Sequence, residues 1–328
     1  MESKAKITAL GAWVPPQKLT NHDLEKMVET SDEWIVQRTG IKERRITDEK
    51  TFASDMAVLA VKDMLARSGK DLSDLDLIIV ATFTGDFLTP SVAALVHGKL
   101  DLQPQVGVID INAACAGFCH GLIAAQAYLT TGICKKVLVI GTECMTKIVD
   151  FTDRNTCVLF GDGAAAMLVE YSEDEPGFLA TYFASQGQSA DKIYCTNLAT
   201  QMNGEDLPFK RKIWQDGRAV YNYSIKTVPQ GVKALCEKAG LSVNDLDWFV
   251  PHSANLRMIE SICEKINFPI EKVLLSLVDY GNTSAASIPL AIWIAYQQGK
   301  LKKGQRLALY GFGGGLNQAG LIINWTLA

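Results

Sequence analysis

The chain has 328 residues, of which 48% are hydrophobic and 21% charged, so it can bury a large core as one domain or as two of roughly 150 residues. This composition excludes a disordered or collagen-like chain. The net charge of −4, from 32 Lys and Arg against 36 Asp and Glu, argues against a nucleic-acid-binding surface or a polybasic membrane surface.

The N-terminal segment, MESKAKITALGAWVPP, has charges at Glu2, Lys4 and Lys6 and only a short apolar run before Pro15. It therefore lacks the apolar core of a signal peptide. No stretch of the sequence approaches the roughly 18 uninterrupted apolar residues of a transmembrane helix. We expect a cytoplasmic protein. The eight cysteines include no zinc-like CxxC pair, so we expect mostly buried thiols and no metal site.

A helix-to-strand unit occurs twice in the chain. In each copy an amphipathic helix ends at a glycine, and a short polar turn leads into an apolar run of strand length. The matching positions, 171 residues apart, are Val61, Gly69 and Asp74 in the first copy and Val232, Gly240 and Asp245 in the second. A second match relates the segments 132–141 and 299–311 at a similar offset. These repeats predict a duplicated α/β architecture with halves at residues 1–171 and 172–328.

Cys115 lies between a predicted strand, Val106–Asn112, and a predicted helix, Ala116–Thr131, that is apolar on nearly all sides and should be central and buried. A cysteine at a helix N-terminus faces unpaired N–H groups, which favour the thiolate and lower the thiol pKa. The small residues around it leave room for a substrate. Cys115 is therefore a candidate nucleophile, although a buried structural thiol is the competing interpretation.

Two further polar residues follow predicted strands in the second half. His252 follows the strand Trp248–Val250, and Asn282 follows the strand Val273–Leu277 and precedes a helix from about Ser284. Open α/β sheets place their chemistry at such strand ends. Each residue alone could be structural, but Cys, His and Asn together indicate nucleophilic catalysis. Their order would also suit a papain-like hydrolase, although the neighbourhood of Cys115 does not match that family.

Two glycine-rich stretches have different interpretations. The segment Phe160–Ala166 has the letters of a GxGxxA dinucleotide fingerprint, but a predicted strand rather than a helix follows it, which disfavours nucleotide binding. The segment Gly311–Gly315 follows the predicted strand Leu307–Tyr310. Such a loop lets the backbone approach a ligand closely and can direct an N–H group at an oxyanion.

Several blocks of the sequence together resemble the 3-oxoacyl-[acyl carrier protein] synthase III (KAS III) family of the thiolase superfamily. The blocks are Thr30–Ile35, Arg38–Ile41, Asp110–Phe118, Thr152–Arg154, Val250–Arg257, Tyr280–Ser287 and Phe312–Gly315. They occur in the family's order through nearly the whole chain. The resemblance implies a thiolase-like, duplicated five-layer αβαβα fold and a homodimer.

The resemblance also implies the reaction that initiates fatty acid synthesis. Cys115 would take an acyl group from acyl-CoA, and the acyl-enzyme would condense with malonyl-acyl carrier protein in a decarboxylative Claisen reaction. The N–H groups of Cys115 and Gly314 would form the oxyanion hole. His252, in its neutral form, and Asn282 would donate hydrogen bonds to the malonyl thioester. No metal or redox cofactor is implied, and neither nucleic acid nor a membrane is an expected partner.

Carried over residue by residue, the resemblance assigns binding roles. Trp34 and Arg38 would stack on the CoA adenine, Arg154 would contact CoA, Asn255 would lie near the pantetheine arm, and Arg257 would dock the carrier protein. Thr89, at a position that is aromatic in members specialised for acetyl primers, would line the primer pocket and admit longer or branched chains. The sequence departs from the family at Tyr221, where Phe is frequent, and at Asn222, where a lysine that docks the carrier protein is common, and both departures bear on the affinity for the carrier protein. Ser253 also replaces a frequent Gln.

Other functions remain open on the residues alone. A relative of the same fold could transfer a starter acyl unit or condense two acyl-CoAs in specialised metabolism. A Cys-His-Asn hydrolase would release free acid without forming a carbon–carbon bond. A noncatalytic partner subunit fits least well, because all three reactive residues are present.

Overall fold

The computed structural model describes residues 2–207 and 211–328, and two β-sheets organise them. The first sheet has the order β1-β7-β6-β4-β5, and the second has the order β13-β14-β15-β8. The strands of the first sheet are β1 (Ala5–Trp13), β4 (Leu77–Ala81), β5 (Gly107–Ile111), β6 (Lys136–Cys144) and β7 (Asp162–Tyr171). Those of the second are β8 (Phe178–Ser185), β13 (Trp248–Pro251), β14 (Arg306–Gly313) and β15 (Asn317–Asn324).

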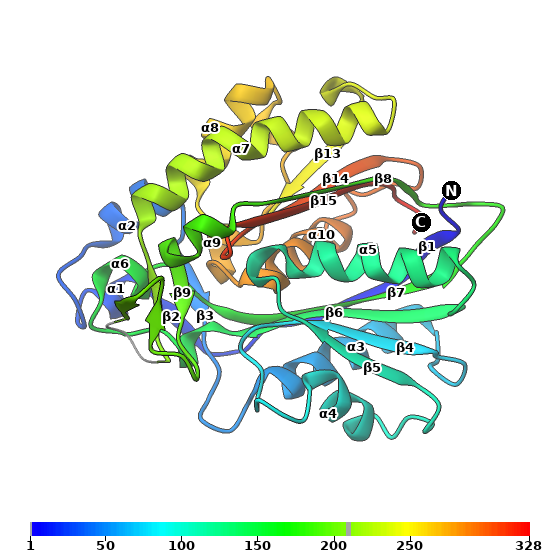
Figure 1. Cartoon of the computed structure of the whole chain (residues 1–328), viewed down its shortest axis with the longest axis horizontal. Helices are drawn as coiled ribbons and strands as arrows, with labels where there is room; N and C mark the ends of the chain where they lie inside the picture. Colours follow the sequence, from blue (N-terminus) through cyan, green and yellow to red (C-terminus); the bar gives the residue numbers. More distant parts are fainter. Residues whose placement is uncertain (1, 208–210) are drawn as a thin grey trace.

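Helices cover both faces of each sheet, which gives five layers (Figure 1). One pair packs between the sheets, a second pair covers the outer face of the first sheet, and a third covers the outer face of the second. These are α5 (Gly117–Thr130) with α10 (Ser287–Gln297), α3 (Ala53–Ser68) with α4 (Val92–Lys99), and α7 (Gly217–Lys238) with α8 (Leu256–Ile266). This is the five-layer αβαβα arrangement that the resemblance implies.

The burial of the strands explains why apolar runs form them. All nine residues of β6 and all five of β4 are buried, as expected for strands of a sheet whose two faces are both covered by helices. The central helix α5 contains no Asp, Glu, Lys or Arg, which lets it lie between two sheets. Its apolar side chains join one core cluster with residues of both sheets.

The two sheets have the same plan. In each, the strand that begins the half pairs antiparallel with the last long strand of that half, as β1 does with β7 and β8 with β15. The next pairs, β7 with β6 and β15 with β14, are antiparallel, and β4 and β13 then pair parallel. The charged turn Ser172–Glu175 lies between β7 and β8. We propose residues 1–171 and 172–328 as the two halves.

One predicted strand is wrong. In the segment Val273–Leu277 a single parallel bridge joins Val273 to Phe249, at the position that corresponds to β5, and the helix α9 (Leu277–Tyr280) follows. The backbone N–H of Ser276 donates to the side chain of Ser253, so side-chain hydrogen bonds replace strand pairing there. The predicted glycine loop is also partly wrong, because β14 continues through Gly313.

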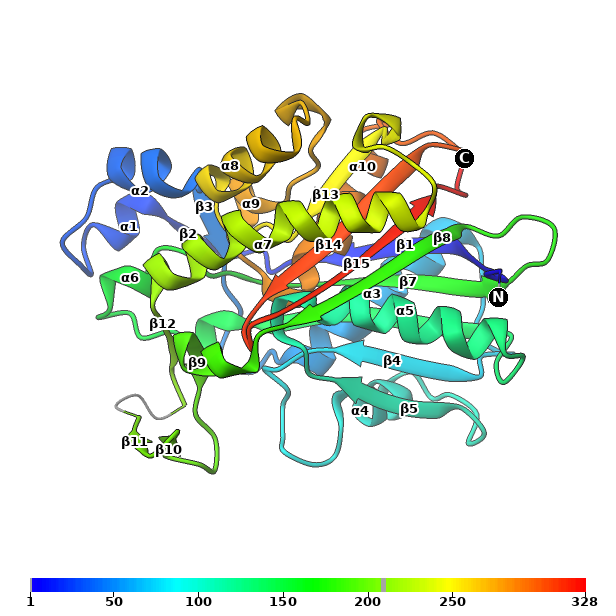
Figure 2. The same cartoon turned by 45° about the horizontal axis from the view of Figure 1, so that its top comes forward.

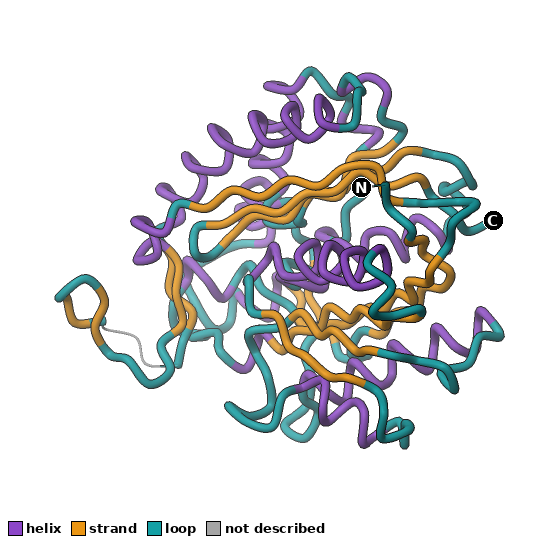
Figure 3. The backbone as a smooth tube through the Cα atoms, turned by 45° about the vertical axis from the view of Figure 1, so that its right-hand side comes forward, coloured by secondary structure: helices purple, strands orange, loops and turns teal. Residues whose placement is uncertain are grey.

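The remaining elements cluster beyond one end of the two sheets, with the small hairpin β10–β11 farthest out (Figures 2 and 3). They are β2 (Lys18–Thr20), α1 (Asn21–Leu24), α2 (Asp32–Thr39), β3 (Glu43–Arg45), α6 (Arg154–Cys157), β9 (Ile193–Cys195), β10 (Gln201–Met202), β11 (Glu205–Asp206) and β12 (Ile213–Gln215). Among the described residues, no helix is both long enough and apolar enough to cross a membrane.

Candidate active site

Cys115 lies in a short 3₁₀ turn, η1 (Ala114–Ala116), between β5 and α5, and it is buried. A matching turn, η6 (Ser284–Ala286), leads into α10 in the second half. Both turns begin with a residue of positive φ, Ala114 at 44° and Ser284 at 47°. Such a backbone conformation is uncommon for a residue other than glycine and is a frequent feature of functional sites. The duplicated fold therefore brings two equivalent turns together at the nucleophile.

The three reactive residues predicted from the sequence meet at one cavity of about 880 Å³. Cys115, His252 and Asn282 all line it, and all three are buried. His252 follows the end of β13, and Asn282 follows α9. The Asn282 side-chain oxygen accepts the N–H of Ser284 at 2.9 Å. This bond fixes the amide, so that its NH₂ group is turned away from Ser284.

His252 is held as a neutral imidazole. Burial lowers the pKa of His252 to about 3, although a hydrogen bond to the backbone of Ser284 opposes the shift. The ring nitrogen Nδ1 lies 2.8 Å from the hydroxyl of Ser287, and that hydroxyl also accepts the N–H of Ser253. The Phe312 ring packs edge-on against the imidazole. A neutral ring can donate one hydrogen bond, but it cannot retain an added proton at neutral pH.

The predicted lowering of the Cys115 pKa is wrong for this structure. Burial raises the pKa of the Cys115 thiol to about 12, and the negative charge of Glu143 adds to the rise. Hydrogen bonds from the Ser284 hydroxyl and from the N–H groups of Cys115 and Gly314 lower the pKa but do not offset desolvation. Cys115 also precedes α5, which begins at Gly117, by two residues. The thiol therefore needs a proton acceptor when it attacks.

The glycines of β14 allow a very close approach of the strand to Cys115. A Cβ atom at Gly313 would lie 2.8 Å from Cys115 Cβ and 2.9 Å from its Sγ, which is too short for any side chain. Gly314 follows Gly313 in the chain. Its backbone N–H and that of Cys115 itself form hydrogen bonds with the sulphur that lower the thiol pKa. These two N–H groups are the candidate oxyanion hole named from the sequence.

A second cavity, of about 800 Å³, also reaches Cys115. Its walls include apolar side chains such as Phe83, Ile148 and Ile193. Thr89 is exposed on the loop that follows Phe87 and Leu88, which do line this cavity, and Thr89 itself is not part of the wall. The role of Thr89 in primer selection stays a prediction. Cys115 therefore lies where the two cavities meet.

The outer end of the first cavity carries the residues assigned to CoA. Trp34, Arg38, Asn255 and Arg257 line it. The guanidinium that lies over the indole of Trp34, 4.3 Å from the ring centroid, belongs to Arg154. Arg38 lines the same cavity as Trp34, and its stacking on the CoA adenine together with Trp34 stays a prediction. Only the folded chain reveals the contact of Arg154 with Trp34, because α6 brings Arg154 to α2 from 120 positions away in sequence.

Two of these residues also have structural roles. The side-chain oxygen of Asn255 caps α8 by accepting the N–H groups of Arg257 and Met258. The Arg257 guanidinium donates to the backbone oxygen of Gln37 at 2.6 Å and so joins α8 to α2. Replacing either residue would therefore disturb the cavity wall as well as any ligand contact.

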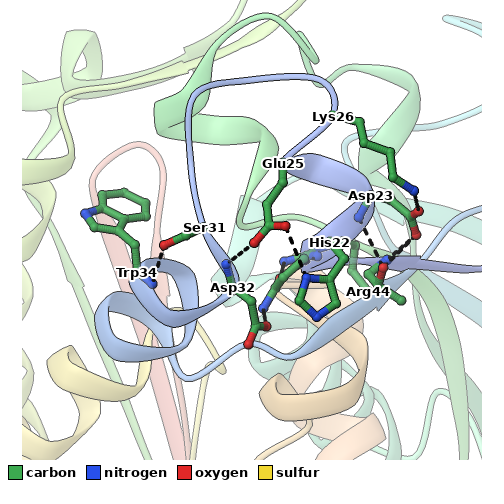
Figure 4. A network of polar contacts seen from close by, with 10 residues as sticks. His22, Asp23, Glu25, Lys26, Ser31, Asp32, Trp34 and Arg44 are labelled. Carbon is green, nitrogen blue, oxygen red and sulfur yellow. Dashed lines mark hydrogen bonds and ion pairs between the residues drawn. The ribbon is translucent and has the colours of Figure 1, made fainter.

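A hydrogen-bond network fixes the helix that carries Trp34 (Figure 4). Ser31 caps α2 by accepting the N–H of Trp34, and the Glu25 carboxylate accepts the N–H of Asp32. Behind them the fully buried guanidinium of Arg44 donates to the Asn21 side chain and to the backbone oxygen of Val158. The wall of the cavity is thus anchored to the core.

Sequence reasoning missed Glu143, Ser284 and Ser287. Glu143 had a signal, because it is an acidic residue within the otherwise apolar run of β6. The two serines had none, since their importance comes from the side chains that the fold places beside them. Residues 2–207 and 211–328 contain no group of three or more His, Cys, Asp or Glu side chains arranged to hold a metal ion.

The chain is similar to known proteins over its whole length. Residues 109–187 match the family described as 3-oxoacyl-[acyl-carrier-protein (ACP)] synthase III, and residues 236–325 match the C-terminal part of the same family. A beta-ketoacyl-[acyl-carrier-protein] synthase III 2 of Halalkalibacterium halodurans is 57% identical over 99% of this chain and 98% of its own. A Bacillus subtilis protein of the same name is 53% identical over 99% of this chain and 100% of its own.

Solved structures show the same similarity. A beta-ketoacyl-[acyl carrier protein] synthase III of Thermus thermophilus has a TM-score of 0.93 and 40% identity, covering 98% of this chain and 99% of its own. The priming beta-ketosynthase of the R1128 polyketide pathway has a TM-score of 0.91 and 32% identity, covering 99% of this chain and 97% of its own.

Proposed function

The chain belongs to the 3-oxoacyl-[acyl-carrier-protein] synthase III family and is an initiating condensing acyltransferase of fatty acid synthesis, and we propose that Cys115, His252 and Asn282 carry out its two half-reactions. The observation that carries this assignment is the position of Cys115 at the junction of two cavities. One cavity suits an acyl chain. The other, with His252 and Asn282 in its wall, suits the pantetheine arm of CoA or of the carrier protein.

In the first half-reaction, the Cys115 sulphur attacks the carbonyl carbon of an acyl-CoA. The N–H groups of Cys115 and Gly314 stabilise the oxyanion of the tetrahedral intermediate. The carbon–sulphur bond to CoA then breaks, and the acyl group remains on Cys115 as a thioester. The CoA sulphur leaves as a thiol after it receives a proton, so the proton from Cys115 ends on the product.

In the second half-reaction, malonyl-acyl carrier protein takes the place of CoA. The neutral His252 ring and the Asn282 amide donate hydrogen bonds to the malonyl thioester oxygen. This stabilises the enolate that forms when the bond to the carboxylate breaks and carbon dioxide leaves. The enolate carbon attacks the acyl thioester, a carbon–carbon bond forms, and the bond to Cys115 breaks, so that Cys115 leaves as a thiolate and then takes up one proton. These roles need only side chains and N–H groups, so we propose that no metal or redox cofactor takes part.

The Ser287 hydroxyl supports the donor role of His252. It accepts the N–H of Ser253, and its own hydrogen can be donated to His252 Nδ1, 2.8 Å away. With Nδ1 as an acceptor, the single proton of the neutral ring lies on Nε2. We assign this tautomer because it provides a donor for the substrate oxygen.

Arg154→Ala is expected to raise the KM for acyl-CoA about tenfold while kcat changes little. A planar cation stacked on an indole contributes about 0.5–2 kcal/mol, and a CoA adenine enclosed by the same pair would lose this contact equally in the ground and transition states. Arg154→Lys is the matched control, because it keeps the charge but loses the planar group. Steady-state kinetics check the prediction, and a fall in kcat at unchanged KM would contradict it.

We propose that the primer pocket accepts branched or longer acyl groups, because the second cavity, whose wall includes Phe87 and Leu88 from the loop that carries Thr89, holds about 800 Å³. Isobutyryl-CoA and longer acyl-CoAs are expected to support kcat/KM values at least equal to that of acetyl-CoA. Thr89→Phe should shift the preference towards acetyl-CoA by about tenfold. A clear preference of the unmodified enzyme for acetyl-CoA would refute the proposal.

We also propose a homodimer. The edge strand β5 is only partly covered, and the neighbouring Phe87 and Leu88 are 64% and 66% exposed. An open strand edge beside exposed apolar side chains suits pairing with a second copy, and the loop bearing Thr89 would then lie at the interface. Light scattering after size-exclusion chromatography tests the assembly, for which a mass of about twice the 35.8 kDa of one chain is expected.

A further inference from the structure

Glu143 is a fully buried acid that the proposed reaction has not yet used. It lies on β6, where every side chain is buried. One carboxylate oxygen accepts hydrogen bonds from the Thr82 hydroxyl and from the N–H and hydroxyl groups of Thr84, at 3.1, 3.2 and 2.5 Å. The other oxygen, Oε1, has no hydrogen-bond donor among the residues that the structure describes when the Ser284 hydroxyl donates to Cys115. An unpaired buried carboxylate oxygen is costly to stability and suggests a function.

Ser284 lies between this acid and the nucleophile. Its hydroxyl donates to Cys115 Sγ at 3.4 Å. The Ser284 side chain can also form a hydrogen bond with Glu143, which lowers the pKa of the carboxyl. A hydroxyl has one hydrogen but can accept as well as donate. When that hydrogen is directed at Sγ, Glu143 Oε1 is left without a donor. The Ser284 hydroxyl is therefore within reach of both groups.

The acylation step needs a proton acceptor near Cys115. Burial holds the thiol pKa at about 12, so the attacking sulphur carries a proton at neutral pH. His252, with its pKa lowered to about 3, cannot hold that proton. Burial raises the pKa of Glu143 to about 7, and the hydrogen bonds from the threonines limit the rise. An acid that titrates near neutral pH is suited to accept a proton and return it.

We propose that Glu143 accepts the Cys115 thiol proton through Ser284 as the sulphur attacks acyl-CoA. The S–H proton passes to Ser284 Oγ, and the hydroxyl hydrogen of Ser284 passes to Glu143 Oε1. When the CoA sulphur leaves, the proton returns through Ser284 to that sulphur, and Glu143 is again a carboxylate. Glu143 touches no substrate and is a positioning residue that holds the proton. This inference rests on the proposed function, because it assumes that Cys115 is acylated.

The groups packed around Glu143 are compatible with this role. Cys115 on η1 and Cys144, the next residue on β6, are the titratable groups whose pKa values its charge raises. Its other contacts are hydroxyl and N–H groups of Thr82, Phe83, Thr84 and Ser284. The carboxyl is therefore free to respond to the proton of Cys115.

The decisive test separates the two half-reactions in Glu143→Gln. We expect the single-turnover rate of Cys115 acylation by isobutyryl-CoA to fall about 100-fold. Condensation of enzyme acylated beforehand with malonyl-acyl carrier protein should stay within about twofold of the unmodified rate, since the acylated sulphur has no proton for Glu143 to accept and the Cys115 thiolate regains its proton only after the carbon–carbon bond has formed. The acylation rate of the unmodified enzyme should rise with pH through about 7, as Glu143 becomes a carboxylate. In Glu143→Gln the acylation rate should no longer rise in this pH range.

Controls separate the relay from general damage. Ser284→Ala should slow acylation by a similar factor, and the double variant should be no slower than the slower single variant. Thr142→Val is the matched control, because Thr142 points to the other face of β6 and loses only its hydrogen bond to the Ala53 backbone. It should leave the acylation rate and the pH profile unchanged.

Two outcomes would overturn the relay. The first is that Glu143→Gln is acylated at the unmodified rate and its acylation rate still rises with pH near 7. The second is that Glu143→Gln slows acylation and condensation equally. Failure of the unmodified enzyme to acylate Cys115 at all would instead refute the proposed function.

Discussion

Replacing Cys115 by alanine is expected to lower kcat/KM for 3-oxoacyl product formation about 10⁴-fold or more. The change removes the sulphur that forms the acyl thioester, and loss of a covalent nucleophile typically costs at least that much. The fold should survive, because Cys115 is a small buried side chain beside Gly313 and alanine removes only its Sγ. Product formation from acyl-CoA and malonyl-acyl carrier protein measures the loss.

The control for this variant is the decarboxylation of malonyl-acyl carrier protein. His252 and Asn282 remain in Cys115→Ala, so slow release of carbon dioxide without condensation should persist. Cys119→Ala is a matched substitution one helical turn further on, at a cysteine that faces Gly311 of β14; it should keep the ability to condense. If Cys115→Ala formed product at more than about a hundredth of the unmodified rate, another residue would have to be the nucleophile.

Replacing His252 by alanine is expected to slow condensation about 100- to 1,000-fold while acylation of Cys115 continues. The change removes one hydrogen-bond donor to the developing enolate, and such losses have this size. Asn282→Ala should have an effect of the same order. Rapid-quench measurement of carbon dioxide release and of product from enzyme acylated beforehand checks both.

The double variant provides the sharper comparison. If His252 and Asn282 act on the same oxygen, the loss in His252→Ala/Asn282→Ala should be smaller than the product of the two single losses. His252→Gln, which keeps a donor near the ring position, should recover part of the rate. Equal slowing of acylation and condensation in His252→Ala would contradict a role confined to the malonyl step.

The large elements of the fold could be predicted from local patterns. The apolar run Leu77–Val80 and the charge-free helix after Cys115 have compositions typical of buried elements; the structure buries the whole strand and the face of the helix that includes Phe118 and Leu122. The repeat offset predicted the duplication, because the same helix, glycine and strand recur in both halves. The strand predicted at Val273–Leu277 was wrong, since Ser276 bonds to Ser253 and nothing local in the sequence reveals that contact.

The candidate site was predictable in identity but not in energetics. Cys115, His252 and Asn282 were proposed because each follows a predicted strand, although the strand predicted before Asn282 does not form, and the fold brings all three to one cavity. The Cys115 pKa was mispredicted because desolvation depends on everything packed around the sulphur, including Gly313 and Glu143. The pairing of Trp34 with Arg154 depends on segments far apart in the chain. Local patterns carry no information on such tertiary contacts.

The most direct test of the central claim is intact-protein mass spectrometry in two steps. The enzyme is first incubated with a panel of acyl-CoAs, and malonyl-acyl carrier protein is then added. The proposed function predicts one acyl adduct per chain that maps to Cys115 and disappears as 3-oxoacyl carrier protein forms. An enzyme that takes up no acyl group on Cys115 from any of the acyl-CoAs, or an adduct discharged only as free acid, would contradict it.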